Sequence, residues 1–140
     1  MKKLLFTVLS ILLIAVGASA QGVLKFEKET HDFGKQNEGP IVTTKFIVTN
    51  TGKAPVVISN AQASCGCTTP EWSKDPIMPG AKSEIKVGFN TSGRPGPFDK
   101  TITVISNAEN GTTVLKIKGT VIGKPEEAAP KAGAAKSKQL

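Results

Sequence analysis

A two-residue alternation of apolar and polar side chains is the feature that most constrains how this chain can fold. Within Val42–Val48 the residues suited to a buried face share one parity, and Thr43 and Lys45 lie on the other. The same period recurs across Ile85–Phe89 and across 101–104. Successive side chains of a β-strand project from opposite faces, so each segment is predicted to be a half-buried strand. No helical period follows residue 20, which predicts an all-β domain.

Shorter segments and turn signals extend this pattern. We expect strands at Leu24–Phe26, within 55–63, and over 114–121, where Leu115, Ile117 and Val121 face inward. Asn110-Gly111 is the dipeptide preferred in type I′ turns, so the strand before it is expected to pair antiparallel with the last one.

Prolines and glycines divide the rest of the chain. Pro70, Pro76 and Pro79 interrupt the segment 68–81, which is expected to hold little regular structure. With turn signals about every ten residues, the pattern indicates a single immunoglobulin-like antiparallel β-sandwich of about seven strands. A closed barrel is the alternative. The short chain and its proline-rich breaks favour the sandwich, because they suit connections that cross between sheets.

The first twenty residues have the three parts of a secretory signal peptide. Lys2 and Lys3 precede an apolar run, Leu4–Val16, and Ala18-Ser19-Ala20 supplies the small residues at a cleavage site. The apolar run is shorter than the roughly 20 residues that a spanning helix needs. We therefore predict a signal peptide at 1–20, an exported and periplasmic protein with secretion as the alternative, and no transmembrane segment after cleavage.

The remaining chain divides into a domain and a tail. Residues 21–123 are predicted to form the sandwich, and 124–140 a disordered tail rich in lysine, alanine and proline, with Leu140 as its single large apolar residue. The formal net charge of +7 overstates the basicity of the domain, because the signal peptide and the tail hold much of the lysine excess. No basic stripe interleaved with aromatics is present, so no nucleic-acid partner is expected.

Two stretches of sequence resemble a known family. Residues 63–72, "ASCGCTTPEW", and residues 77–107, "IMPGAKSEIKVGFNTSGRPGPFDKTITVISN", closely resemble the bacterial domain of unknown function numbered 1573. That family is similar in turn to the immunoglobulin-like domains of the abnormal-spindle, hydin and major-sperm-protein group. The resemblance covers about Phe26 to Val121. It implies an exported, single or repeated module of Gram-negative envelopes with no established activity.

The two cysteines, Cys65 and Cys67, are the one place with possible covalent or metal chemistry. In an extended strand, residues two apart project from the same face with Cα atoms about 6.6 Å apart. A disulfide tolerates at most about 6.8 Å and prefers less. Bonding the pair therefore becomes easy where Gly66 lets the backbone turn. The first alternative is such a disulfide, or a quiet dithiol, at a sheet-to-loop corner.

Two further alternatives remain open at this pair. Cys65 and Cys67 as thiolates could bind Cu(I), the one cofactor that the sequence suggests, with His31 and Met78 as the available imidazole and mature thioether. A lone histidine is more often a surface or satisfied partial-core residue, and Met78 more often packing. The third alternative is thiol–disulfide exchange, because a small strained disulfide is easily reduced.

Trp72 and Arg94 are candidates for a binding loop. Trp72 could stack on a ligand, although the chain has no tyrosine and no second tryptophan, so capping of the core is the simpler interpretation. Arg94 lies in the loop 92–97, which is also readily explained as a glycine- and proline-rich crossover.

No catalytic residues are predicted. His31 has no accompanying nucleophile motif such as G-x-S-x-G, and no paired carboxylate cluster is present. The sequence therefore predicts a non-enzymatic protein-interaction or structural module of the bacterial cell envelope. Its partner would be an unknown envelope protein, bound by pairing with an edge strand. The alternative function is a thiol-based copper-binding or redox-exchange site at the Cys-Gly-Cys motif.

Overall fold

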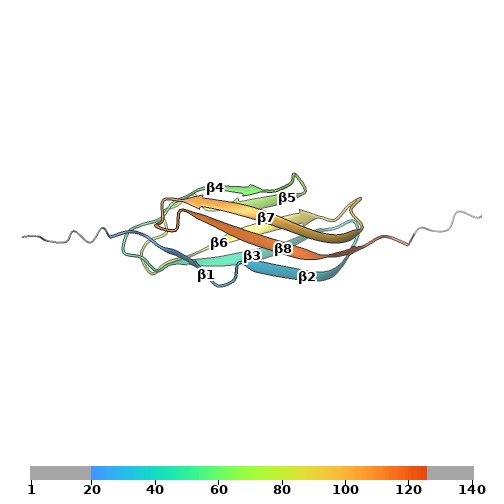
Figure 1. Ribbon diagram of the computed structural model, residues 1–140, viewed down its shortest axis with the longest axis horizontal. Helices are drawn as coiled ribbons and strands as arrows, with labels where there is room; N and C mark the ends of the chain where they lie inside the picture. Colours follow the sequence, from blue (N-terminus) through green and yellow to red (C-terminus); the bar gives the residue numbers. More distant parts are fainter. Residues whose placement is uncertain (1–19, 126–140) are drawn as a thin grey trace, which may run out of the picture.

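Two four-stranded sheets pack face to face in the computed structural model, which describes residues 20–125 (Figure 1). The predicted signal peptide, apart from Ala20, and the predicted tail beyond Pro125 lie outside the described residues. The first sheet has the order β1 (Leu24–Phe26), β3 (Ile41–Asn50), β6 (Lys82–Asn90), β5 (Thr68–Trp72). The second has the order β2 (Thr30–Asn37), β8 (Thr112–Ile122), β7 (Gly96–Ser106), β4 (Ile58–Ala63).

The core between the sheets follows the two-residue period. The predicted inward-facing residues Phe46, Val87 and Ile102 are each 0% exposed. Full burial of a large apolar side chain stabilises the fold by about 1.5–3 kcal/mol. The rings of Phe89 and Phe98 stack between the sheets with their centroids 4.1 Å apart. The all-β sandwich predicted from the sequence is confirmed, and none of residues 20–125 forms a helix that could cross a membrane.

The number of strands and the strand pairing differ from the prediction at one strand, β2. No sequence pattern predicted β2, whose polar residues are mostly exposed and which pairs with β8 in parallel. Its register shifts between Asp32 and Lys35, where Gly34 has φ +64°. An interrupted edge strand with one shallow inward face carries no clear alternation, so residues 20–125 form eight strands where about seven were expected.

The expectation of little regular structure over 68–81 is wrong for its first part. Thr68–Trp72 forms β5, the edge strand beside β6. The backbone N–H of Asn90 donates to the carbonyl of Cys67 at 2.9 Å. The antiparallel alternation then points the nitrogen of Pro70 away from β6, where a missing N–H removes no ladder hydrogen bond.

The connection from β7 to β8 corrects a second expectation. The two strands pair antiparallel as predicted, but the residues between them, 107–111, do not form a type I′ turn. Such a turn needs positive φ at both central residues, and neither Asn110 nor Gly111 has it. The side chain of Asn110 instead bonds the backbone of Leu24: Oδ1 accepts from its N–H at 3.1 Å and Nδ2 donates to its carbonyl at 2.8 Å.

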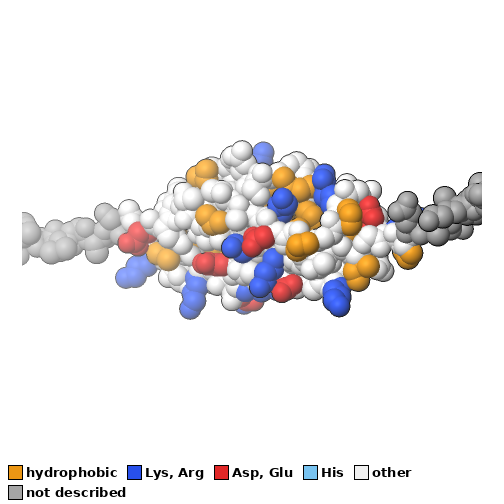
Figure 2. Space-filling model, turned by 45° about the vertical axis from the view of Figure 1, so that its right-hand side comes forward, with side chains coloured by type: hydrophobic (Ala, Val, Ile, Leu, Met, Phe, Trp, Pro, Cys, Tyr) orange, Lys and Arg blue, Asp and Glu red, His pale blue; other side chains and the backbone are white. Residues whose placement is uncertain are grey.

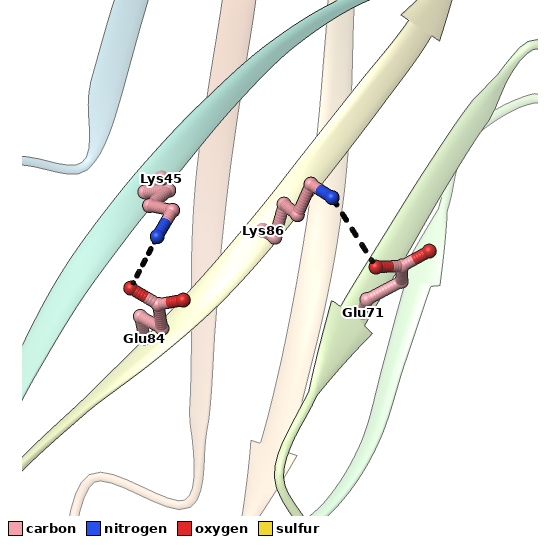
Figure 3. A network of polar contacts seen from close by, with 4 residues as sticks. All are labelled: Lys45, Glu71, Glu84 and Lys86. Atoms are coloured by element: carbon pink, nitrogen blue, oxygen red, sulfur yellow. Dashed lines mark hydrogen bonds and ion pairs between the residues drawn. The ribbon is translucent and has the colours of Figure 1, made fainter.

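The outer faces of both sheets carry cross-strand ion pairs. In the first sheet Lys45 lies 2.9 Å from Glu84, and Lys86 lies 3.8 Å from Glu71 (Figure 3). Figure 2 shows charges of both signs interspersed with separate apolar side chains over one face. Exposed pairs of this kind contribute about 0–1 kcal/mol each, so they favour solubility more than stability.

Candidate functional site at the Cys-Gly-Cys corner

The cysteines lie where the chain passes from the second sheet to the first. β4 ends at Ala63 and β5 begins at Thr68, and the chain turns between them at Gly66 and Cys67. Cys65 and Cys67 form a disulfide with their Cα atoms 5.3 Å apart. This agrees with the expectation that the bond requires a turn at Gly66, which is exposed and has open space on its side-chain side.

The corner is held by hydrogen bonds to both sheets. The backbone N–H of Ser64 donates to the carbonyl of Thr101 in β7 at 2.9 Å, and Thr101 N–H donates back to the Ser64 hydroxyl at 3.2 Å. On the other side, Asn90 in β6 donates to Cys67. The disulfide closes a ring of a few residues, so it fixes this turn and does not join distant parts of the chain.

The two cysteines differ in exposure, and one hydroxyl lies near both of their sulfurs. Cys67 is buried at 8% exposure, and Cys65 is half-buried. The hydroxyl of the buried Thr68 lies 3.6 Å from Cys65 Sγ and 3.9 Å from Cys67 Sγ. Its backbone N–H donates to the carbonyl of Cys65 at 3.3 Å. Thr68 is therefore placed to donate a hydrogen bond to either sulfur, and sequence reasoning missed it because no motif marks a threonine for this role.

A shallow hollow of about 360 Å³ lies beside the disulfide on the outer face of the first sheet. Gly88 is one of the residues that line it, and a Cβ at this position would lie 3.4 Å from the Ile41 side chain. Cys67 borders one end, and the Lys86–Glu71 ion pair drawn in Figure 3 borders the other. The hollow can accommodate a few side-chain atoms of a partner but does not enclose a ligand.

The structure does not bring His31 or Met78 to the cysteines. His31 lies on β2, at the opposite edge of the second sheet from β4, which is three strand spacings or about 14 Å away. Met78 precedes β6, whereas Cys67 contacts the last residue of that nine-residue strand. Within residues 20–125 no group of three or more histidine, cysteine or acidic residues could hold a metal ion. Copper binding by the two cysteines alone stays a prediction.

His31 has a perturbed environment of its own. Its Nδ1 lies 3.0 Å from Lys28 Nζ, and its ring meets that of Phe33 edge-on at 4.6 Å. Burial lowers the pKa of His31 from its usual 6.5, the positive charge of Lys28 lowers it further, and Asp32 opposes both. The imidazole is thus held towards its neutral form on an edge strand.

Trp72 and Arg94 do not share a surface site. Trp72 is half-buried in β5 and its indole Nε1 donates to the carbonyl of Ile58 in β4 at 3.1 Å, which ties the two sheets together. Arg94 is exposed in the β6–β7 loop, beyond the end of β6, while Trp72 pairs with Ile85 near its start. The predicted binding role of each residue stays a prediction, and they would have to act separately.

Comparison with known families places the whole sandwich in one group. A family model described as "Protein of unknown function (DUF1573)" matches residues 24–121. This range agrees with the resemblance seen over about Phe26 to Val121. No similarity to a curated protein was found.

Solved structures show similarity in fold alone. A protein of unknown function from Porphyromonas gingivalis W83 is 17% identical with a TM-score of 0.65, over 77% of this chain and 51% of that one. The ASH/PapD-like domain 7 of human CEP192 is 9% identical with a TM-score of 0.63, over 75% and 89%. The YadV chaperone is 13% identical with a TM-score of 0.50, over 76% and 55%. This chain thus spans about half the length of the Porphyromonas protein.

Proposed function

The chain belongs to the DUF1573 family of proteins of unknown function, and we propose that it is a non-enzymatic protein-interaction module of the bacterial cell envelope. The observation that carries this proposal is the open sandwich, in which each four-stranded sheet ends in two edge strands. Edge strands present backbone N–H and C=O groups that can pair with an extended segment of another protein. The fold is similar to that of a protein described as a chaperone, YadV.

The proposed location rests on the N-terminal sequence. The basic start at Lys2 and Lys3, the apolar run and the small residues at Ala18 and Ala20 support export, with the periplasm as the proposed compartment and secretion as the alternative. Cell fractionation with N-terminal sequencing of the mature protein tests this step. A mature N-terminus at Gln21 in the periplasmic fraction is expected, and an unprocessed chain in the cytoplasm would contradict it.

In vivo photo-cross-linking tests the interaction module. A photoreactive amino acid replaces exposed outer-face residues, one at a time, beside different edges: Thr43, Glu71, Asn60 and Lys35. We expect a discrete cross-linked protein from at least one of these positions in the native envelope. The positions beside the other edges serve as its matched controls. Absence of any adduct from all four positions, with the protein correctly exported, would overturn the proposed function.

A second candidate function is thiol–disulfide exchange at Cys65–Cys67, which the half-buried position of Cys65 and the Thr68 hydroxyl favour. A partner's thiolate would attack Cys65 Sγ, the Cys65–Cys67 bond would break, and the electron pair would leave on Cys67 Sγ as a thiolate. Thr68 would stabilise that thiolate by donating a hydrogen bond, because hydrogen bonds to ionised groups are stronger than neutral ones.

Thr68→Val tests this role directly. It removes the hydroxyl while keeping the shape of the side chain, so the disulfide should become several-fold harder to reduce in equilibrium with glutathione. Thr68→Ser, which keeps a hydroxyl, should behave as the wild type. Equal reduction in all three would contradict the exchange site. Copper bound by the reduced chain and lost in Cys65→Ser/Cys67→Ser would instead support the metal alternative.

A further inference from the structure

The edge strands differ in how many backbone groups they leave open. β1 is three residues long, and both outward groups of Leu24 are bonded to the Asn110 side chain. β5 has Pro70 in mid-strand, and the N–H of Thr68 is already used by the carbonyl of Cys65. Short length and proline are devices by which natural sheets block pairing at an edge. Neither strand is therefore suited to receive a partner.

The two edges of the second sheet are also blocked. The register of β2 shifts between Asp32 and Lys35, and the carbonyl of Asn37 accepts from the Thr91 hydroxyl at 3.2 Å. A break in register and flanking charges both disfavour strand addition. In β4 the carbonyl of Ile58 is bonded to Trp72 Nε1, and Ala61 is covered to 6% exposure.

One stretch of edge lacks these devices, and it lies on β3. β6 pairs with β3 along Ile41–Thr49, but β1 covers the other side only at Val48–Asn50. Glu27 N–H donates to the carbonyl of Ile47, which extends that cover by one residue. Among the described strands, the segment Ile41–Lys45 is thus paired on one side only.

The direction of the unpaired groups follows from the ladder. The carbonyl of Ile47 points towards β1, and alternate residues of an antiparallel strand point the same way. Ile41, Thr43 and Lys45 therefore turn their N–H and C=O groups away from β6. Within residues 20–125 no hydrogen bond to these groups is found, and all three residues are exposed, Ile41 to 64%.

The side chains around this edge define what could pair with it. Val42 on β3 and Phe33 on β2 are half-buried and pack against the core, so inward-facing side chains of an added strand would meet apolar surface. On the outer face, an apolar or β-branched residue suits the position opposite Ile41. An acidic residue suits the position opposite Lys45, whose exposed ammonium is bonded to Glu84 on the β6 side and has further N–H donors to offer.

We propose that the unpaired half of β3, Ile41–Lys45, is the edge that receives an extended segment of a partner protein, about five residues long, with apolar side chains facing inward and an acidic side chain opposite Lys45. This inference rests on the proposed interaction function and names its surface. The added strand would continue the line of β1 along the first sheet. It would satisfy the outward backbone groups of Ile41, Thr43 and Lys45, for which residues 20–125 provide no partner.

The test uses the full mature chain and a synthetic probe. The probe is a nine-residue peptide in which valine and threonine alternate between terminal glutamates, with acetylated and amidated ends. In an NMR titration, the amides of Ile41, Thr43 and Lys45 should shift and exchange with solvent at least tenfold more slowly. The same peptide N-methylated on alternate residues cannot donate along one edge and should give no protection. Changes confined to another edge, or none at millimolar peptide, would overturn the proposal.

A proline variant tests the same edge from the protein side. Thr43→Pro removes an outward N–H without touching the β3–β6 ladder, and at least a tenfold loss of peptide affinity is expected. Ala63→Pro makes the matching change on β4 and should leave the affinity unaltered. Equal losses in both variants would contradict a site on β3. The N-methylated peptide keeps the test valid if Thr43→Pro fails to fold.

Other occupants of the edge give distinct results. If residues 126–140 are deleted and the amides of Ile41 and Thr43 then exchange faster, the chain's own C-terminal segment occupies this edge. If the protein dimerises with rising concentration and Thr43→Pro abolishes the dimer, a second copy of the chain occupies it. Either result would overturn the proposed partner. Cross-links from the native envelope that persist unchanged in Thr43→Pro would refute this edge while leaving the interaction function standing.

Discussion

The two ends of the sandwich hold irregular chain in different ways. At one end, the buried side chain of Asn50 donates to the carbonyls of Ala54 and Ile77 at 2.7 and 2.8 Å, and accepts from the N–H groups of Val23 and Gly52. At the other end, the Cys65–Cys67 disulfide closes a turn within itself. One amide thus joins several segments that are distant in sequence, whereas the covalent bond joins near neighbours. The noncovalent end should contribute more to stability.

Asn50→Ala should produce the largest effect. It leaves buried carbonyl and N–H groups without partners, which should lower the free energy of unfolding by about 3–4 kcal/mol, measured by chemical denaturation. Asn60→Ala, at an exposed position on β4, should change it by less than about 0.5 kcal/mol. A loss below about 1 kcal/mol in Asn50→Ala would contradict the importance of this end.

Asn110→Ala should have the next largest effect, because it removes both hydrogen bonds between the β7–β8 connection and Leu24. We expect a loss of about 1–2 kcal/mol in the same measurement. Asn110→Asp keeps the acceptor for the Leu24 N–H but loses the donor to its carbonyl, so its loss should be intermediate. A loss in Asn110→Asp equal to or larger than that in Asn110→Ala would show that repulsion between the new carboxylate and the Leu24 carbonyl offsets the retained hydrogen bond.

Reduction of the disulfide should cost less than Asn50→Ala and about as much as Asn110→Ala. The loop that Cys65 and Cys67 close is so short that the chain-entropy model gives only about 1.5 kcal/mol. Denaturation with and without dithiothreitol measures this loss, and Cys65→Ser/Cys67→Ser, which has no thiols, should not respond to the reductant. Loss of cooperative folding on reduction would reverse the comparison between the two ends.

The smallest effect should come from a group at neither end. The pKa of His31 on β2 is lowered in the folded chain, so the unfolded chain binds more protons in mild acid. The free energy of unfolding should therefore fall slightly as pH drops below about 6.5, the unfolded value. His31→Gln should flatten this part of the pH profile. An unchanged profile would assign the pH dependence elsewhere.

The core was predictable because its pattern is local. Phe46, Val87 and Ile102 are marked as inward by their immediate neighbours, and each is fully buried. β5 was missed because a proline usually interrupts a strand. Pro70 is tolerated because β6 lies on the side of β5 away from the proline nitrogen. This depends on the order of the strands in the sheet, which a single sequence does not specify.

In the candidate sites, too, some features follow from the local sequence and others only from the three-dimensional structure. That a disulfide between Cys65 and Cys67 would need a turn at Gly66 follows from their spacing alone, whereas the presence of the bond does not. The contact of Thr68 with both sulfurs and the unpaired groups of Ile41 require three-dimensional placement. Asn110 illustrates how a strong turn signal can mislead: its amide bonds the backbone of Leu24, and neither Asn110 nor Gly111 has the positive φ of a type I′ turn.

The parallel pairing of β2 with β8 has a mechanical consequence. The described chain enters at one end of the molecule and leaves at the other (Figure 1), so tension between its two ends would pull these strands in opposite directions along their length. A ladder sheared in this way must break many hydrogen bonds together, whereas a ladder peeled from one end breaks them singly. A domain stretched between two attachment points would therefore resist extension through its least regular strand.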